Sequence, residues 1–246
     1  MIQRVRWWLL SSGTVCLLFG ILWTHPSVLF PHRIEVSGIR LCSDSPFCEA
    51  DARILIEDTI QRMQSIPGWK PSKGQSAFIC NSAWRRRLFF FPSPDAGGLA
   101  CYLLPHSFFS GGDIALKQLI RKDGQAVTDE RTLSYFIAHE FTHIHHERLV
   151  GTWRFHRTPD WIKEGYADFV GRGNAWERET AKEGFLSNSP EMKTPVVAPY
   201  LRYNLLFSYY HTQLGLSVES LSKHPPSLEE AEAALTRALS HSNPGF

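Results

Sequence analysis

The sequence predicts an α+β fold in which a small mixed or antiparallel sheet comes first and a helical half follows. Before about residue 125, short apolar runs are separated by prolines and paired glycines, which is typical of strands joined by turns. After that point, apolar residues recur at helical spacing over longer segments. Strands and helices are thus segregated along the chain, and this favours α+β over a repeating βαβ arrangement.

Each half can be divided further by its breakers and its periodicity. In the strand-rich part, residues 25–125, Pro67 and Gly68 end an amphipathic helix, while Gly97 and Gly98 separate two apolar runs. In the helical part, residues 126–246, Ser227 is expected to cap the last helix. The expected strands are 33–41, 77–80, 88–91, 100–104 and an edge strand at 111–116; the expected helices are 50–66, 129–150, one from about 160, 175–185, 200–214 and 227–239.

Length, composition and charge limit the classes of function. A chain of 246 residues with 43% hydrophobic and 13% aromatic residues can bury the core of one domain. A net charge of +2 gives no electrostatic reason to expect nucleic acid as a partner. The short basic run of Arg85, Arg86 and Arg87 could face anionic lipid or substrate, or form the polar edge of a strand or loop.

The amino terminus resembles a signal anchor. Arg4 and Arg6 precede an uncharged stretch, 7–23, whose ~17 residues are at the short end of what spans a bilayer. We therefore expect a cytoplasmic end at 1–6, a transmembrane segment at 7–24 with Trp23 as an interfacial anchor, and one extracytoplasmic domain at 25–246. This predicts a single-pass protein of the cell membrane, periplasmic in a Gram-negative cell; a cleaved signal peptide is the alternative.

Four cysteines in the strand-rich part agree with export. They can be connected in three ways, of which the combination of Cys42–Cys48 with Cys80–Cys101 is favoured, because the first bond closes a short loop and the second joins two expected strands. Four free thiols are the alternative for a cytosolic domain. Cysteine ligation of a metal is less attractive, since the chain contains no Cys-x-x-Cys pair.

A metal-binding pattern lies within the expected helix 129–150. His139 and His143 are four residues apart, so they share one face of a helix and can offer two imidazoles to one ion. Glu140 lies one step round, where it can act as a base toward a water molecule that the metal activates. The pattern alone is not decisive in a chain with 11 histidines, because a pair of satisfied core histidines would look the same.

A second segment strengthens the metal interpretation. Glu164 and Asp168 are four residues apart on the helix that starts near 160, so Glu164 can reach the metal while Asp168 lies behind it. A ligand histidine normally donates its second N–H to a carboxylate or carbonyl, and Asp168 is a candidate for that partner. Gly165 would allow the two helices to approach closely.

Together, the two segments resemble the gluzincin metallopeptidases, which include thermolysin and the large zinc aminopeptidases. The resemblance covers residues 129–170 and rests on His-Glu-x-x-His followed by Trp-x-x-Glu-Gly-x-Ala-Asp. It implies a zincin-like fold with one Zn²⁺ per chain. By matching positions it implies His139, His143 and Glu164 as zinc ligands, Glu140 as general base, and Asp168 as the residue that orients a ligand histidine.

The spacing of the histidines excludes one other class of metal site, and several residues are candidates for an oxyanion donor. A metzincin would need Gly and His where the chain has His146 and Leu149, so that class is excluded. His145 and His146 are expected at the rim or surface, and His156 in a loop. Related enzymes often take an oxyanion donor from downstream; Tyr203 is preferred among the candidates Tyr200, Tyr203, Tyr209, Tyr210 and His211.

These observations lead to one principal expectation and two alternatives. The principal expectation is a membrane-anchored zinc metallopeptidase that hydrolyses peptide or protein substrates outside the cytoplasm. The first alternative is a non-catalytic binding or scaffold protein of the cell envelope that zinc stabilises. The second is an accessory envelope protein without metal.

Overall fold

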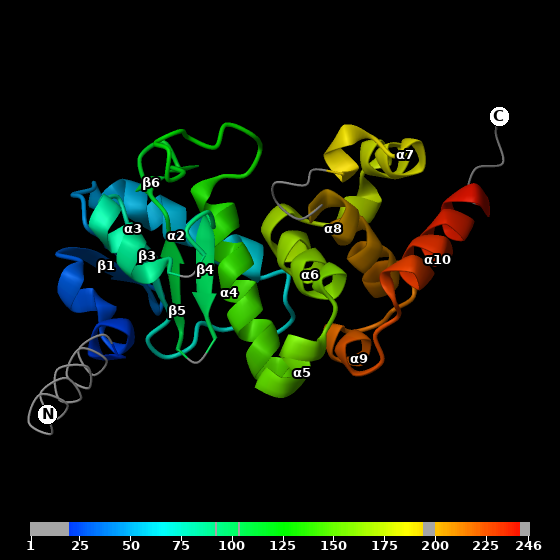
Figure 1. Ribbon diagram of the computed structural model, residues 1–246, viewed down its shortest axis with the longest axis horizontal. Coiled ribbons are helices and arrows are strands. Elements are labelled where there is room, and N and C mark those ends of the chain that lie inside the picture. Colours follow the sequence, from blue (N-terminus) through cyan, green and yellow to red (C-terminus); the bar gives the residue numbers. More distant parts are fainter. Residues whose placement is uncertain (1–19, 92, 103, 194–199, 242–246) are drawn as a thin grey trace, which may run out of the picture.

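The computed structural model describes residues 20–91, 93–102, 104–193 and 200–241. Figure 1 shows a half that contains the sheet beside a half built from helices, with α4 running between them. A mixed sheet followed by a helical half confirms the predicted α+β class.

The main sheet has the order β1-β2-β3-β5-β4, so β4 forms one edge. Its outer pairs, β1–β2 and β5–β4, are antiparallel, whereas β2–β3 and β3–β5 are parallel. The strand expected at 33–41 is a hairpin, because Ser37 and Gly38 adopt φ of 51° and 85° and reverse the chain between two strands. The strands are β1 (His32–Val36), β2 (Ile39–Ser43), β3 (Ser76–Ile79), β4 (Gly98–Cys101) and β5 (His106–Phe109).

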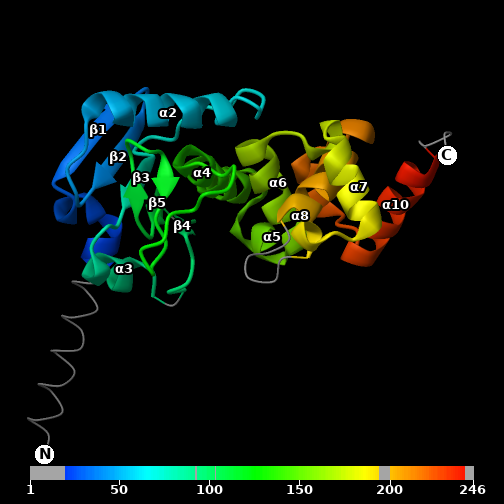
Figure 2. The same cartoon turned by 90° about the horizontal axis from the view of Figure 1, so that it is seen from above.

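The two faces of the sheet carry different helices. Helix α2 (Glu49–Met63) packs with α4 (Leu133–Val150) on the face that carries Leu41 and Ile79. Helix α3 (Ala83–Phe89) covers the opposite face with an aromatic cluster that includes Phe78 and Phe108. Figure 2 shows α2 and α3 on opposite sides of the strands.

Helix α3 replaces the strand that was expected at 88–91. The carboxylate of Asp44, at the end of β2, accepts the backbone N–H groups of Asn81 and Ser82 at 2.8 Å each. These are donors that the start of a helix leaves unpaired, so Asp44 caps α3 from a distant part of the chain. The apolar run Leu88 to Phe91 looks like a strand only when this long-range contact is unknown.

The helical half begins with α4, which starts at Leu133 because the hydroxyl of Thr132, not Thr128, accepts the N–H of Tyr135. At the other end, Ser227 and Glu230 exchange hydrogen bonds with each other's backbone N–H groups, which confirms the expected cap of the last helix. Besides α4, the elements are α5 (Thr152–Arg157), α6 (Asp160–Arg172), η2 (Ala175–Glu177), α7 (Glu179–Ser187), η3 (Pro190–Met192), α8 (Tyr200–Ser208), η4 (Tyr209–Gln213), α9 (Val218–Lys223) and α10 (Leu228–His241).

The expectation of a membrane-spanning segment is corrected. Within the described ranges, no helix has both the length and the apolar character needed to cross a bilayer, which contradicts the predicted single-pass location in a cell membrane. Most of the expected anchor at 7–24 lies outside the described residues. Trp23, expected as an interfacial anchor, instead packs its ring against Phe89 and Phe108, with centroids 5.9 and 5.6 Å apart, so this part of the segment belongs to the folded domain.

The expected disulfides are also wrong: no two of Cys42, Cys48, Cys80 and Cys101 lie at disulfide distance. Cys80 follows β3 and Cys101 ends β4, but β5 lies between these strands. Two strand spacings place the backbones ~10 Å apart, whereas a disulfide needs Cα atoms within about 7 Å. Cys42 is buried on the face of β2 that contacts the α3 cluster, while Cys48 is exposed at the start of α2, on the other face.

Candidate metal centre

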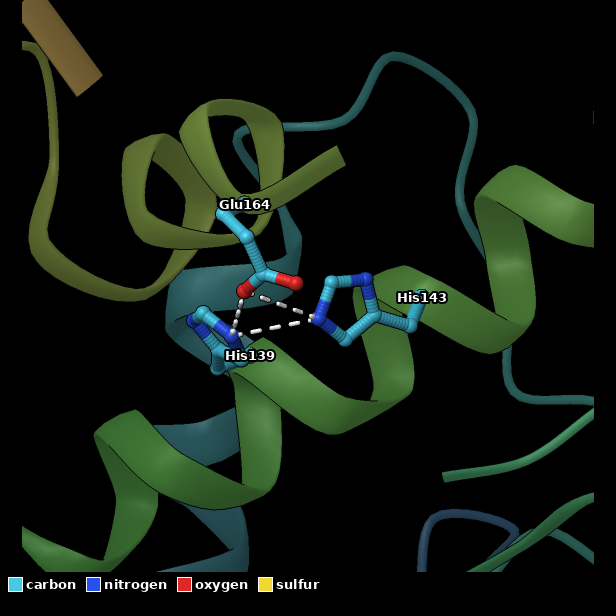
Figure 3. Close-up of side chains that lie close together, drawn as sticks. All are labelled: His139, His143 and Glu164. Atoms are coloured by element: carbon cyan, nitrogen blue, oxygen red, sulfur yellow. Dashed lines mark hydrogen bonds and ion pairs between the residues drawn. The ribbon is translucent and has the colours of Figure 1, made fainter. Parts of the chain in front are cut away.

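Helix α4 presents the two histidines of the His-Glu-x-x-His pattern as expected from their spacing. His139 and His143 are each 5% exposed, and their Nε2 atoms lie 3.2 Å apart. Both rings project from the same side of α4 toward α6, as Figure 3 shows. The helical periodicity that was read from the sequence therefore produces this half of the site.

Helix α6 supplies the third group. One carboxylate oxygen of Glu164, Oε2, lies 3.1 Å from Nε2 of His139 and 3.4 Å from Nε2 of His143 (Figure 3). The two helices come close where Gly171 meets Tyr135, since a Cβ atom on Gly171 would lie 2.8 and 2.9 Å from ring atoms of that tyrosine. The glycine expected to permit this approach was Gly165, which instead faces Tyr203 and Phe207 of α8.

The spacing of the three donor atoms fits a tetrahedral metal ion. Bonds of about 2.0–2.2 Å directed to the corners of a tetrahedron hold any two ligand atoms ~3.3 Å apart. The three observed separations, 3.1, 3.2 and 3.4 Å, are close to this value. Within the described chain, His139, His143 and Glu164 therefore form a possible metal site with three of four positions supplied by protein.

Electrostatics favour a cation at this point. Burial would raise the pKa of Glu164, but the charges of His143 and His139 and their hydrogen bonds outweigh it and hold that pKa well below its usual range. Burial would likewise lower the pKa of His143, whereas the carboxylates of Glu164 and Glu140 raise it. The Glu164 carboxylate therefore stays ionised in this pocket, as a cation site requires, and the imidazoles can bind a metal only in their neutral form.

Asp168 is close to the site but makes no hydrogen bond to either histidine. It is fully buried, and it accepts the hydroxyl of Tyr135, Nδ2 of Asn204 at 2.9 Å and Nε of Arg172 at 3.1 Å. The ring of Tyr135 in turn lies 5.8 Å from the ring of His139. In this structure the contact from Asp168 toward the metal site therefore passes through Tyr135, and the direct orienting role remains a prediction.

The two histidines of this possible site leave their other ring nitrogens without a hydrogen-bond partner among the described residues. Both atoms, Nδ1 of His139 and Nδ1 of His143, are buried. A buried polar atom without a partner costs free energy, and ligand histidines normally donate this N–H. The described residues thus supply no hydrogen-bond partner to either Nδ1 atom, and the orienting role of Asp168 that the resemblance implied stays a prediction.

Glu140 points to the edge of the sheet. A Cβ atom on Gly98 would lie 2.5 Å from Oε1 of Glu140, and the backbone of Ala100 gives Glu140 a hydrogen bond that lowers its pKa. Burial has the larger effect, and with the nearby charge of Glu164 it raises that pKa above the usual range for a carboxyl group. The base candidate therefore lies between the two histidines' helix and β4.

The edge strand beside the site is β4, not the segment expected at 111–116. That segment forms only a two-residue strand, β6 (Gly112–Asp113), which pairs with β7 (Gln118–Leu119) in a separate small sheet. β4 packs against α4 and pairs on one side only, with β5. Among the described strands nothing pairs with its other side, which lies beside Glu140 and where the backbone N–H of Ala100 donates to that carboxylate; this depends on strand order and was therefore hidden in the sequence.

Two tyrosines lie close to the carboxylates of the site. The ring of Tyr200 meets the ring of His139 edge-on at 5.3 Å, and burial together with Glu164 and Glu140 raises its pKa. Burial and the same two carboxylates raise the pKa of Tyr102, which follows β4 and was missed in the sequence. Its proximity depends on where β4 lies, so no local signal could have identified it.

Tyr203 was preferred as the catalytic tyrosine, and the structure gives it different neighbours. After burial, the charges that most affect its pKa are those of Asp160 and Glu232, with Glu164 last. Its backbone carbonyl packs against Gly165. Tyr200, which lies three residues earlier in the same helix, has its ring against His139.

His146 is buried rather than at the rim, as had been expected. Its Nε2 lies 2.8 Å from Oγ of Ser222 in α9, and its ring meets Phe155 and Tyr166 edge-on at 5.2 and 5.6 Å. His156 is exposed at the end of α5 and touches Tyr102, with ring centroids 5.8 Å apart. His146 is thus part of the core contact between α4 and α9.

The burial of His146 predicts a loss of stability in acid. Burial lowers the pKa of His146 to about 3, so the folded protein keeps it neutral while the unfolded chain binds a proton near pH 6.5. The free energy of unfolding should therefore fall by up to ~1.4 kcal/mol per pH unit between pH 6.5 and 3 on account of this group. Urea unfolding of the metal-free protein across this range, beside the His146→Gln variant, measures it; equal slopes for both proteins would contradict the assignment.

Comparisons of this chain with models of protein families, with curated proteins and with solved structures found no match. The function is therefore inferred from the geometry of the chain itself. Two imidazoles and one carboxylate could hold a metal ion, and a second carboxylate and an edge strand lie beside them.

Proposed function

We propose that this protein is a zinc-dependent peptidase of the gluzincin type, with a zincin-like fold. The observation that carries the proposal is the meeting of three donor atoms at tetrahedral spacing with Glu140 beside them at the edge strand. Two imidazoles and a carboxylate are a ligand set that zinc accepts, and three protein ligands with one open position are typical of catalytic rather than structural zinc sites.

Zinc held by His139, His143 and Glu164 would supply Lewis acidity, which polarises a peptide carbonyl and makes water more acidic. Glu140 then acts as general base: it removes a proton from the attacking water and delivers it to the amine that leaves. A base works best when its pKa is near the working pH, and burial raises the pKa of Glu140 in that direction.

The unpaired edge of β4 fits a peptide substrate. Backbone N–H and C=O groups at a strand edge can bind an extended peptide as an additional strand, without regard to its side chains. Because Gly98 and Ala100 of β4 adjoin Glu140, a peptide bound there would pass close to the base. This arrangement supports a peptide as the substrate in preference to a small ester or amide.

The Glu140→Gln variant tests the proposed reaction. The amide keeps the shape of the side chain but cannot accept the proton, so kcat on a mixed peptide library should fall at least ~10³-fold, within the range for a lost general base. Zinc content measured by elemental analysis should remain one ion per chain. Mass spectrometry of the digested library reports the cleavage.

Two outcomes would contradict this assignment. Equal cleavage by the parent and by Glu140→Gln would show that Glu140 is not the base. If zinc raises the melting temperature of the parent but no peptide is cut, the chain is a zinc-stabilised binding module and not a peptidase.

Tyr200 is the group that we propose for stabilising the developing oxyanion. Its hydroxyl belongs to a ring that contacts His139 and lies near Glu164 and Glu140. Loss of one such donor typically lowers kcat by about 10²–10³ with little change in KM, and Tyr200→Phe should do so. Tyr203→Phe, the matched change on the same helix, should alter kcat less than about threefold; the reverse order of effects would favour Tyr203.

A further inference from the structure

A second candidate site lies on α3, on the side of the sheet away from the metal centre. The three arginines of the basic run, Arg85 to Arg87, differ in what they contact. Arg85 is used by the fold: its Nε donates to the carbonyl of Leu29 at 2.8 Å, and its guanidinium lies 3.3 Å from the carboxylate of Asp44. Arg86 and Arg87 are not used in this way and remain available to bind something else.

The charges of Arg86 and Arg87 are not neutralised by the fold. Among the described residues, the side chain of Arg86 makes one hydrogen bond, a long one of 3.5 Å to the carbonyl of Arg121. Arg87 is exposed, and its side chain has no hydrogen bond or ion pair within the part of the chain that is described. Lys122 contacts Asp95, but both side chains are more than half exposed, and such pairs contribute little.

These three cations border a groove of about 510 Å³ whose other walls are apolar. The groove is lined by Arg86, Arg87 and Lys122 together with Phe90, Phe91 and Pro94, and no acidic side chain is among its lining residues. A volume of this size is typical of small-molecule sites. Phe91 is 73% exposed, so a large apolar surface faces solvent next to the cations.

One wall of the groove, helix α3, is held in place at both ends. Phe89 stacks on Phe108 with ring centroids 4.3 Å apart, which fixes the end of α3 on the sheet. Asp44 fixes the beginning of α3 through Asn81 and Ser82. The wall of the groove that α3 forms is therefore already ordered, which reduces the conformational entropy lost when a ligand binds.

We propose that this groove binds an anionic amphiphile, with a phosphate or carboxylate head at Arg86, Arg87 and Lys122 and an apolar chain over Phe91 and Pro94. Guanidinium groups pair well with phosphate and carboxylate, and aromatic rings beside basic side chains suit molecules with one charged and one apolar end. The head group of an acidic phospholipid and a free acyl anion share this chemistry. The inference does not depend on the peptidase proposal, because none of its residues belongs to the metal centre.

The test uses the full chain and dihexanoyl phosphatidylglycerol below its micelle-forming concentration, titrated by calorimetry. Saturable binding is expected, and the uncharged-overall analogue dihexanoyl phosphatidylcholine, with the same chains, should bind at least fivefold more weakly. Removing one cation should weaken binding about fivefold. The affinity of Arg87→Gln for the lipid should therefore fall about fivefold, and that of the double variant Arg86→Gln/Arg87→Gln should fall further. Phe91→Ala should also weaken binding, and inorganic phosphate, which lacks the chain, should bind far more weakly.

Arg53→Gln is the matched control, because Arg53 is exposed on α2, on the other side of the sheet. Unchanged circular dichroism and melting temperature would show that each variant is folded. Equal binding of the two lipids, equal binding by Arg87→Gln, or inorganic phosphate binding as tightly as the lipid would each overturn the proposal. Cosedimentation with vesicles containing about a third phosphatidylglycerol identifies the source of the ligand. If the double variant cosediments less than the parent, the ligand is bilayer lipid; if both cosediment equally, it is a free amphiphile, and both results are consistent with the site.

Discussion

Replacing His143 with alanine should abolish zinc binding. The variant removes one of three donor atoms that lie 3.1–3.4 Å apart, so the remaining pair cannot hold the ion in a tetrahedral site. The affinity should fall well over a hundredfold, more than the loss of an outer contact to a ligand would cause. Competition with a chromophoric chelator measures the affinity, and elemental analysis measures the metal content.

The same variant should remove the stabilisation that zinc provides. A ligand present at a thousand times its Kd stabilises a protein by ~4 kcal/mol, which for a chain of this size corresponds to about 10 °C in melting temperature. The parent should show this shift on adding zinc, and His143→Ala should not. His145→Ala, on the same helix but outside the donor set, is the control and should behave as the parent. A His143→Ala protein that still binds one zinc with parental affinity would refute the ligand assignment.

Predictions from local spacing succeeded where the structure depends on local spacing. His139 and His143 share a face because a helix turns 100° per residue, a relation that holds wherever the helix lies in the fold. The prediction for Glu164 needed one further assumption, that α6 packs on α4, and the apolar residues of α6 made this packing predictable. The cap formed by Ser227 and Glu230 is contained within four residues and was correct for the same reason.

Predictions that needed strand order or distant contacts failed. Cys80 and Cys101 looked like a pair because a disulfide between them would join two expected strands, but β5 inserts between β3 and β4. The segment 88–91 looked like a strand because its capping residue, Asp44, is far away in sequence. The edge strand was placed at 111–116 rather than at β4 since nothing local distinguishes an edge strand from a central one.

The choice between Tyr200 and Tyr203 of α8 also depends on a contact between distant segments. Tyr200 and Tyr203 are three residues apart, so they lie near one face of the helix, and spacing alone does not separate them. What separates them is the register of α8 against α6, set where Gly165 receives the carbonyl of Tyr203. That register places Tyr200 at His139 and leaves Tyr203 beside Asp160 and Glu232.

This contact makes Gly165 the position where a single methyl group should do most harm to the fold. A Cβ atom there would lie 2.9 Å from both the carbonyl carbon of Tyr203 and Cβ of Phe207, and it would overlap the carbonyl oxygen of Tyr203. These are atoms at or next to the backbone, so α8 and α6 must separate. Overpacking of this kind costs ~1–3 kcal/mol or more, and Gly165→Ala should lower the melting temperature by about 5–10 °C.

The effect of Gly165→Ala should extend to the metal centre, because Gly165 directly follows Glu164 and a shift of α6 moves that carboxylate away from His139 and His143. Zinc affinity should therefore fall even though all three donors are still present, whereas a purely local loss of stability would leave the affinity of the folded protein unchanged. Gly20→Ala is the matched control: Gly20 is also helical, and within the described chain no side chain or distant backbone atom lies within 4 Å of the added Cβ, so stability should be unchanged or slightly higher. If Gly165→Ala melts like the parent, α6 and α8 are not packed through this glycine, and the register that places Tyr200 beside the site loses its physical basis.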